Sequence, residues 1–372
     1  MFTLNGKYTD ATIFTDNIDN ETIGQIMYMI NHLDFLEGSK IAIMPDCHAG
    51  KGCVVGTTMT IKDKIVPRFV GSDLGCGVLA VKLKQESLDL AELDNVIRTH
   101  VPHGYTLHAE DIKPLYDPEY NKLHADISLN RAPRSLGTLG GGNHFIEIDK
   151  DNDGFLWLVI HTGSRHLGNE IAKYYNQVAA NRYLSASNKN YHPDFMYLEG
   201  QDFENYFEDV LIAQSFARQN RMLIAKTIMD NMHLDCYSFI ETAHNYIDAT
   251  VNNGIILRKG AVAAKLNEEL VIPLNMRDGT LICTGLGNNE WNQSAPHGAG
   301  RAMKRSVAKD AVSLDEYKDA MKGIYTTSVN QSTIDESPMA YKPAQQIIDC
   351  IKPTVTIKSV MKPIYNFKSS ID

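Results

Sequence analysis

The stretch 155-FLWLVIHTGSRHLG-168 contains the two patterns that govern the fold of this chain. Its first half is a short apolar run, which is typical of a buried β-strand and ends at His161. A turn with Gly163 and Ser164 follows, and residues 168–186 then carry apolar side chains at the i, i+3, i+4 spacing of a helix. The sequence therefore predicts a strand, a glycine-containing turn and a helix in direct succession.

The same strand-and-turn texture recurs in three other stretches rich in glycine and β-branched residues. They are 41-IAIMPDCHAGKGCVVGTTMTI-61, 68-RFVGSDLGCGVLAVKL-83 and 134-RSLGTLGGGNHFIEID-149. A second helix is predicted over 204–231, a polar loop over 187–202, strands and turns over 237–305, short helices over 314–323 and 342–352, and a last strand over Thr354–Ile357 or Ile364–Phe367. We therefore expect an α+β fold, a single compact domain (residues 1–372) of mixed β-sheets flanked by helices, with a helical insertion over approximately 168–236.

The composition excludes several classes of protein. Hydrophobic residues make up 43% and charged residues 22% of the 372, as in a globular protein. The net charge of −9 means that a nucleic-acid partner would need a local basic patch. The N-terminus, MFTLNGKYTD, lacks the features of a signal peptide, and no apolar run is long enough to span a membrane. Six cysteines in so long a chain predict no disulfide framework, which favours the cytoplasm.

Polar residues that can bind metals stand in the glycine-rich turns. They are Asp73 and Cys76 in VGSDLGCGV, His144 after Asn143, His161, His244 before Asn245, and His297 in PHGAG. Glycine lets the backbone approach a ligand closely, and catalytic groups often occupy such loops at strand ends. Imidazole, thiolate and carboxylate together suit a transition metal rather than an all-oxygen magnesium site.

Each of these residues also has a structural interpretation when taken alone. A cysteine is commonly a small buried hydrophobic residue, a histidine at a strand end is commonly structural, and an aspartate can hydrogen-bond its own turn. Five such residues in glycine-rich turns are not a usual core pattern, which favours the metal site. His48 and Cys53 could join a metal site, but His48 beside Lys51 could instead contact a phosphate. Five further histidines are expected to be solvated: His100, His103, His108, His124 and His192.

In chain order, the motifs MPDCHAGKG, VGSDLGCG, GTLGGGNHFIE, HTGSRHLG, HN and SAPHGAGR resemble those of the RtcB-type RNA-splicing ligases. The C-terminal segments DESPMAYK and MKPIYNFK also resemble that family. The resemblance covers roughly residues 8–368, and it is specific because the motifs occur together and in order.

The resemblance implies a GTP- and Mn²⁺-dependent ligase of RNA repair or tRNA splicing. Such an enzyme joins RNA 3′-phosphate or 2′,3′-cyclic phosphate ends to 5′-hydroxyl ends, through a guanylylated histidine and an RNA(3′)pp(5′)G intermediate. The HGAG motif places that histidine at His297. The implied ligands of two Mn²⁺ ions are Asp73, Cys76, His144, His161 and His244. The implied GTP or GMP contacts are Asn143, Glu147, His244, Asn245, His297, Gly298, Ala299, Gly300 and Lys368.

One segment departs from the family pattern. Where the family often has Pro-Gly-Ser-Met against the nucleotide, this chain has Pro273-Leu274-Asn275-Met276. We expect Pro273, Asn275 and Met276 to contact the nucleotide nevertheless, and Thr280 stands where a serine contact is expected. Because the family's Gly and Ser are replaced here by Leu274 and Asn275, the contacts of this segment with guanine are expected to differ from the family's.

The expected partners are GTP and an RNA end, with no membrane, and the protein is expected to be a monomer. The net charge argues against tight non-specific binding of RNA, but a narrow groove can grip a single-stranded end through few phosphate contacts and stacking. Candidate contacts are Arg131, Arg134, Arg165, His166 and Arg301. An alternative is a metal-dependent cyclic phosphodiesterase or phosphohydrolase that does not seal ends, and a third possibility is a catalytically silent sensor. Only the ligase requires His297 and Lys368.

Overall fold

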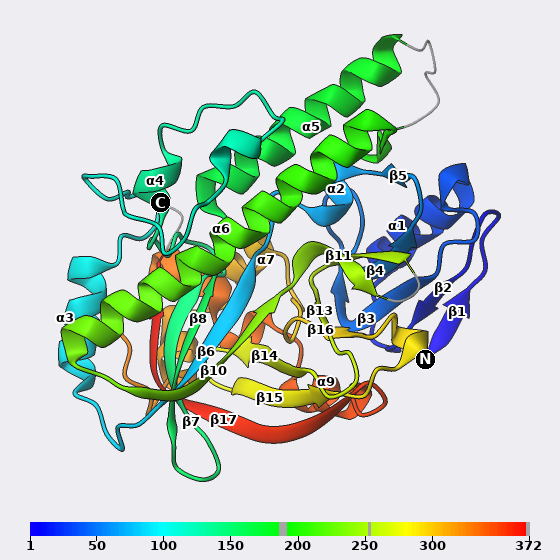
Figure 1. The fold of residues 1–372 in the computed structure, drawn as a ribbon. Helices are drawn as coiled ribbons and strands as arrows, with labels where there is room; N and C mark the ends of the chain where they lie inside the picture. The colour runs from blue at the N-terminus through cyan, green and yellow to red at the C-terminus, as the bar shows by residue number, and fades with distance from the viewer. Residues whose placement is uncertain (186–191, 252–253, 370–372) are drawn as a thin grey trace.

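The stretch at residues 155–168 forms the predicted strand and helix. In the computed structural model, strand β8 spans Leu156–Thr162 and helix α5 spans Arg165–Ser185 (Figure 1). The helix was predicted to start at Gly168, but Gly168 already lies in the first turn of α5, where a β-carbon would overlap the hydroxyl of Ser164. The helix therefore begins closer to the strand than the sequence pattern indicates. The structure describes residues 1–185, 192–251 and 254–369.

Strand β8 lies inside an antiparallel sheet. Within the described residues this sheet has seven strands in the order β10-β6-β8-β7-β17-β15-β14. The other strands are β6 (Gly77–Leu83), β7 (Phe145–Lys150), β10 (Cys236–Ala243), β14 (Glu269–Asn275), β15 (Gly279–Gly285) and β17 (Val355–Lys368). Figure 1 shows β17, in red, curving along the lower side of this sheet.

The two faces of this sheet have different surroundings because successive side chains of a strand alternate between them. Leu158 and Ile160 belong to the apolar core between the sheet and helices α3 (Leu90–His100) and α6 (Gln201–Met232). Trp157 and Val159 face the other side, where apolar side chains of all seven strands meet. The sheet curls enough for its edge strands β10 and β14 to contact each other. His161 shares the inner face with Trp157 and Val159.

Strand β17 corrects the prediction for the C-terminus. The sequence offered Thr354–Ile357 or Ile364–Phe367 as the last strand, and a single strand, Val355–Lys368, covers nearly all of both. It pairs with β15 through its first half and with β7 through its second half. The pairing register shifts near Pro363, which cannot donate a backbone hydrogen bond and so divides the sequence pattern in two.

A second sheet is formed mainly by the N-terminal part of the chain. Its strand order is β1-β2-β3-β4-β12-β11 within the described residues, and helix α1 (Asn20–His32) contributes to the same apolar core. The strands are β1 (Phe2–Leu4), β2 (Ala11–Ile13), β3 (Ile41–His48), β4 (Val55–Ile61), β11 (Asn245–Val251) and β12 (Gly254–Lys259). Strand β3 carries the MPDCH motif at its C-terminal end.

The predicted helical insertion is present as the pair α5 and α6, drawn in green across the top of Figure 1. Helix α6 packs against α5, α3 and strands β6 and β8. The predicted loop over 187–202 is partly ordered, because a 3₁₀ turn spans Pro193–Phe195, strand β9 spans Leu198–Glu199 and α6 already begins at Gln201. Residues 187–191 of that loop lie outside the described residues, as does residue 186 at the end of the predicted helix.

The remaining elements are short, and the whole confirms the predicted α+β class. They are β5 (Lys64–Ile65), α2 (Pro67–Val70), α4 (Ala132–Ser135), β13 (Ala261–Ala263), β16 (Ser294–Pro296), α7 (Arg305–Ala311), α8 (Leu314–Ala320) and α9 (Ala344–Cys350). Strand β13 pairs with β16, and β5 with β9. Among the described helices, none has the length and apolar character needed to span a bilayer.

Candidate active site and metal centre

A cavity of about 460 Å³ lies where the ends of both sheets meet. Its walls come from β3 and the loop after it, the turn before β6, the ends of β8 and β10, strand β14, the loop 297–300 and the end of β17. Every one of these segments contains a motif that the sequence singled out. Residues far apart in the chain are thus brought to one site by the curl of the seven-stranded sheet.

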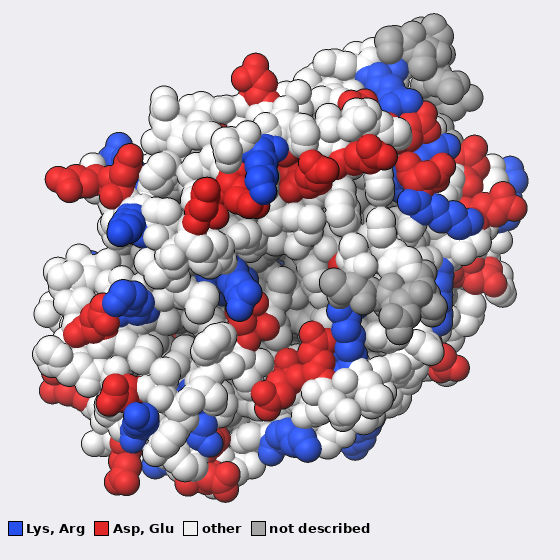
Figure 2. Space-filling view, in the orientation of Figure 1, with Lys and Arg blue, Asp and Glu red and all other residues white. Residues whose placement is uncertain are grey.

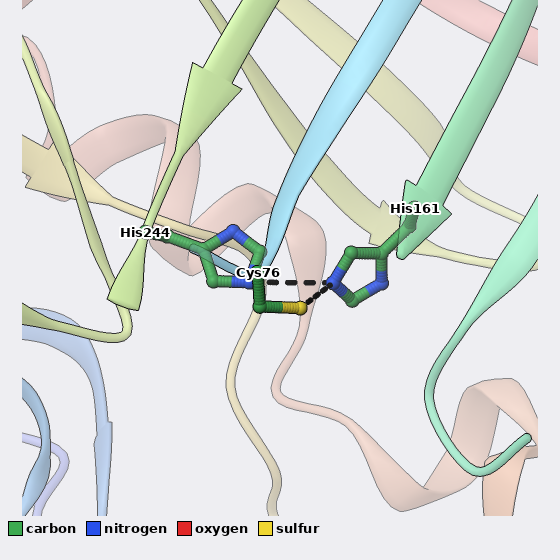
Figure 3. Close-up of side chains that lie close together, drawn as sticks. All are labelled: Cys76, His161 and His244. Atoms are coloured by element: carbon green, nitrogen blue, oxygen red, sulfur yellow. Dashed lines mark hydrogen bonds between the residues drawn. The ribbon is translucent and has the colours of Figure 1, made fainter. Parts of the chain in front are cut away.

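Two overlapping sets of metal-binding groups stand against this cavity and share Cys76. Figure 3 shows the first set, in which Sγ of Cys76 lies 3.3 Å from Nε2 of His161, and that nitrogen lies 3.3 Å from Nε2 of His244. In the second set, Nε2 of His144 lies 3.6 Å from the same sulfur and 3.0 Å from Oδ2 of Asp73. All five predicted ligands are therefore brought together.

The outer hydrogen bonds of the histidines fit a metal centre. Nδ1 of His144 donates to the carbonyl of Leu139 at 2.9 Å, and Nδ1 of His161 donates to the carbonyl of Asn143 at 3.1 Å. Because a carbonyl only accepts, Nδ1 carries a proton in both rings, and Nε2 of His161 is left facing Sγ of Cys76 and Nε2 of His244. One sulfur and two imidazole nitrogens converge here within 4.8 Å of one another, and these are ligand types that a transition metal prefers. The donor set thus fits a bound metal ion.

Burial sets the ionisation of these groups. Burial, and then the neighbouring positive groups, lower the pKa of His161 and His244 well below the ordinary value, so both rings are neutral, as a metal requires. Burial opposes ionisation of Asp73, but hydrogen bonding and charge from His144 outweigh it and lower its pKa to about 2. Burial and the Asp73 charge raise the pKa of the Cys76 thiol. A thiolate there needs a cation beside it.

His297 stands beside this centre. Its ring lies 4.9 Å, centre to centre, from that of His244, and its side chain is 18% exposed to the cavity. Nδ1 of His297 lies 2.6 Å from Oδ2 of Asp46, and the backbone N–H of His297 donates to the same oxygen at 3.2 Å. The ring N–H meets the carboxylate obliquely, so this contact is an electrostatic pair rather than an aligned hydrogen bond. Because Nδ1 faces Asp46, Nε2 is the ring nitrogen that could react with a ligand in the cavity.

A buried ionic cluster forms another wall of the cavity. Glu336 receives Nζ of Lys368 at 2.7 Å, Nη1 of Arg301 at 3.2 Å, a second guanidinium from Arg305, and the hydroxyl of Tyr341 at 2.5 Å. Burial opposes ionisation of Glu336, yet the charges of Lys368, Arg305 and Arg301 outweigh it and lower its pKa to about 2. Arg305 also pairs with Asp335 at 2.7 Å, so three cations share two carboxylates and leave one positive charge in excess.

The cavity as a whole is cationic although the chain is acidic. Its lining contains six basic side chains, Lys51, Arg68, Lys259, Arg301, Arg305 and Lys368, against the two carboxylates Asp73 and Glu147. On the outer face drawn in Figure 2, basic and acidic side chains are interspersed, and a row of acidic ones follows the α5–α6 pair. The local basic patch required by the net charge of −9 is therefore inside the cavity.

Most of the residues predicted from the sequence line this cavity. They are Asp73, Cys76, Asn143, Glu147, His161, His244, Asn245, Pro273, Asn275, Met276, His297, Gly298, Ala299, Gly300, Arg301 and Lys368. His144 lies just behind Asp73 and Cys76. Thr280 is fully buried in β15 and does not line the cavity. Arg131, Arg134, Arg165 and His166 also lie outside its lining among the described residues.

The remaining histidines and cysteines divide between cavity and core. His48 lines the cavity, and burial lowers its pKa to about 4. Cys53 belongs instead to the apolar core. His100, His124 and His192 are exposed as expected, whereas His103 and His108 are half-buried and hydrogen-bond to backbone carbonyls, which corrects their prediction as solvated. All six cysteines are free, as expected.

Several contacts in the site were not predicted. Asp46 and Glu336 lie inside the motifs MPDCHAGKG and DESPMAYK, so their residue types gave a signal, but neither partner could be read from the sequence. Lys259 is buried at the cavity wall, where its ammonium donates to the carbonyls of Arg68 (3.0 Å) and Lys51. Arg68 and Tyr341 also line the cavity.

Comparisons with known proteins show which proteins this chain is similar to. A family model described as "tRNA-splicing ligase RtcB" matches residues 28–123 and 118–369. The RNA-splicing ligase RtcB1 of one Escherichia coli strain is 33% identical over 364 residues, covering 86% of this chain and 89% of that protein. The RNA-splicing ligase RtcB of another strain is 34% identical with the same coverage. The tRNA-splicing ligase RtcB of Methanococcus maripaludis is 26% identical, covering 96% of this chain and 93% of its own.

Proposed function

The chain belongs to the RtcB family of RNA-splicing ligases, and on that premise we propose that it seals RNA with GTP, through a guanylylated His297. The ends joined are a 3′-phosphate, or a 2′,3′-cyclic phosphate after its opening by water, and a 5′-hydroxyl. The whole chain, residues 1–372, then acts as one catalytic domain, working as a monomer in RNA repair or tRNA splicing.

The observation that carries this proposal is the place of His297. The side chain faces the cavity, adjoins the proposed metal ligand His244 and is paired through Nδ1 with the buried carboxylate of Asp46. A neutral imidazole with one nitrogen held by a carboxylate is a competent nucleophile at the other nitrogen. A metal-dependent phosphohydrolase would need the metal ligands but would not need a nucleophilic His297.

The proposed reaction has three steps. Nε2 of His297 attacks the α-phosphorus of GTP, the bond to the β-phosphate breaks, and pyrophosphate leaves. An oxygen of the RNA 3′-phosphate then attacks the same phosphorus, the N–P bond breaks, and RNA(3′)pp(5′)G forms. Finally the 5′-hydroxyl attacks the RNA 3′-phosphorus, loses its proton and expels GMP. Asp46 stabilises the positive charge that His297 gains during the first step.

The proposed ligands of Mn²⁺ are Asp73, Cys76, His144, His161 and His244. Their division into two sets that share one sulfur supports a site for two ions. Bound metal ions would neutralise phosphate charge and orient the reacting phosphates. Asp73 and Cys76 supply the anionic ligands, and the buried histidines supply neutral nitrogens.

The proposed guanylate contacts surround His297. Glu147 and Lys368 come from the paired strands β7 and β17, where Glu147 pairs with Asn366 and Lys368 with Phe145, and Asn143 precedes His144. Asn245 fixes the backbone there, since its Oδ1 accepts from the N–H of Gly260 at 2.9 Å. Pro273, Asn275 and Met276 line the cavity despite their departure from the family pattern. Thr280 supports this wall from beneath as a buried neighbour of Pro273 in the sheet, rather than as a direct contact.

The proposed RNA contacts are the cationic groups of the cavity. Arg301 lies in its wall, as do Lys51, Arg68 and Lys259, which sequence reasoning did not name as RNA contacts. Lys259 lies close to Lys51 and Arg68, since its ammonium donates to their backbone carbonyls, whereas Arg301 shares Glu336 with Lys368. A phosphorylated RNA end would meet them there, while the mixed charge of the outer surface disfavours binding along the length of the RNA.

Intact-protein mass spectrometry after incubation with GTP and Mn²⁺ tests the proposal. A mass increase equal to one GMP is expected in the wild type and in His124→Ala, a histidine exposed on the surface. The increase should be acid-labile and absent from His297→Ala. If the wild type forms no adduct with Mn²⁺ or other divalent ions but still opens 2′,3′-cyclic phosphates, the protein is a phosphohydrolase instead.

A further inference from the structure

The middle of helix α6 carries two successive polar residues, Asn220 and Arg221, whose side chains are fully buried. They lie where α6 packs against β6 and β8, a contact otherwise made by apolar groups. A buried guanidinium loses several kcal/mol of hydration, and an apolar residue is often the more stable choice at such a place. The hydrogen bonds of these two side chains show what they do instead.

Arg221 holds three segments that carry proposed metal ligands. One of its terminal nitrogens, Nη1, donates to the carbonyl of Gly75 at 2.9 Å and to the carbonyl of Thr162 at 2.8 Å. Gly75 directly precedes Cys76, and Thr162 directly follows His161. The other terminal nitrogen pairs with Glu241, three residues before His244 on β10. One side chain therefore fixes the strand ends from which Cys76, His161 and His244 project.

Asn220 completes the set. Its amide nitrogen donates to the carbonyls of Thr138 (3.0 Å) and Gly163 (3.1 Å), and its oxygen accepts from the N–H of Thr138 at 3.1 Å. The next residue, Leu139, supplies the carbonyl that orients the His144 ring. Gly163 leaves no room for a side chain against Asp73, whose Oδ1 accepts from the N–H of Ser164 at 3.2 Å. The segments behind His144 and Asp73 are thus tied to the same helical turn.

We propose that Asn220 and Arg221 are positioning residues, which hold the five ligand-bearing segments in register for metal binding. This inference rests on the metal site of the proposed function. Arginine suits the role because its planar fork presents several donors at fixed angles, which a lysine cannot reproduce. The helical insertion then takes part in metal binding, because Asn220 and Arg221 on α6 hold the ligand-bearing segments in place from behind the sheet.

Gln219 provides a matched control on the same turn of α6. It is also fully buried, and its Oε1 accepts from the N–H groups of Leu115 (2.9 Å) and Tyr116 (3.2 Å), which belong to a loop without ligands. The variants to compare are Asn220→Leu, Arg221→Lys and Gln219→Met, each checked for a folded far-ultraviolet dichroism spectrum. Calorimetric titration with Mn²⁺ measures affinity. The absorption of the Co²⁺ complex, including its thiolate charge-transfer band, reports ligand geometry.

Loss of support behind metal ligands typically weakens binding by 10- to 100-fold. We expect roughly that loss of Mn²⁺ affinity and an altered Co²⁺ spectrum in Asn220→Leu and Arg221→Lys, with wild-type values in Gln219→Met. The proposal is overturned if both variants keep wild-type affinity and spectrum, or if Gln219→Met loses as much, which would indicate general loosening of the helix. A wild type that binds neither ion refutes the metal site itself, whereas failure to form the GMP adduct refutes only the His297 reaction.

Discussion

Replacing Asp46 with asparagine should slow guanylylation of His297 strongly while leaving the fold intact. Asp46 is fully buried, and its Oδ2 lies 2.6 Å from Nδ1 of His297. During attack on GTP the imidazole gains positive charge, which the carboxylate stabilises and an amide of the same shape does not. Asparagine still offers an oxygen to the backbone N–H of His297, so the loop should keep its place.

The size of the effect follows from the separation of the two groups. At 2.6 Å and an effective dielectric constant of about 20, the attraction between unit charges is about 6 kcal/mol, which is an upper limit. Because the ring N–H meets the carboxylate obliquely, the lower range found for hydrogen bonds to charged groups, about 1.5–3 kcal/mol, is the better guide. At 1.4 kcal/mol for each factor of ten, adduct formation should slow by roughly 10- to 100-fold.

The assay is single-turnover formation of the GMP adduct, followed by intact mass with Mn²⁺ and GTP in excess. Asp209→Asn is the matched control, because Asp209 is equally buried but accepts from the N–H groups of His124 and Ala125 and from the hydroxyl of Tyr175. It should lose stability and keep its rate per folded molecule. An Asp46→Asn rate within about threefold of the wild type would show that the carboxylate does not assist His297.

Gly300→Ala should lower both the free energy of unfolding and the adduct yield, because φ is 73° there and a β-carbon would overlap the carbonyl of Asp46. Gly323→Ala is the control, because φ is 90° there and a β-carbon would meet open space. It should lower the free energy of unfolding by only about 1 kcal/mol and leave the adduct yield unchanged. Cys76→Ser should weaken Mn²⁺ binding by at least about tenfold and remove the thiolate charge-transfer band of the Co²⁺ complex, since a hydroxyl does not replace a thiolate ligand. An unchanged band would exclude Cys76 as a ligand. Glu336→Gln should cost about 3 kcal/mol near pH 7, because the folded pKa of about 2 lies below the ordinary 4.5. That contribution is present above pH 4.5 and is lost as the pH falls toward 2. Urea unfolding should therefore give the wild type and Glu336→Gln similar free energies of unfolding in acid. Equal stability of the two proteins at pH 7 would refute a stabilising role of the Glu336 carboxylate.

The parts of the fold that could be predicted depend on local signals. The strand and helix around residues 155–168 follow from a short apolar run and a helical repeat, each of which reports its own surroundings. Two predicted boundaries of helices or strands differ from those in the structure. The helix predicted from Gly168 begins three residues earlier, at Arg165, and the alternative last strands Thr354–Ile357 and Ile364–Phe367 are covered by one strand, β17.

The sequence predicted which residues belong to the site, but it did not predict which of them contact one another. Glycine-rich turns and ordered motifs indicated the five candidate metal ligands and His297, which the structure brings together in the wall of one cavity or, for His144, directly behind it. The contact of Asp46 with His297 spans 251 residues of sequence. It exists only because β3 of one sheet ends beside the loop that follows β16. No local pattern encodes that meeting, and the same holds for the contacts of Arg221 with Gly75 and Thr162.

The distribution of charge bears on how an acidic chain could act on RNA. A non-specific RNA-binding surface gains affinity from many phosphate contacts, and a net charge of −9 with acidic side chains along α6 opposes that mode. The proposed reaction needs contact with only the phosphates at the junction, and the cavity offers six cations against two carboxylates at that place. An acidic exterior around a cationic cavity favours release of the sealed RNA, because the joined RNA no longer has an end that can enter the cavity. The acidic exterior is therefore compatible with turnover on RNA, and it makes the terminal phosphate, rather than the length of the RNA, the feature that the enzyme would recognise.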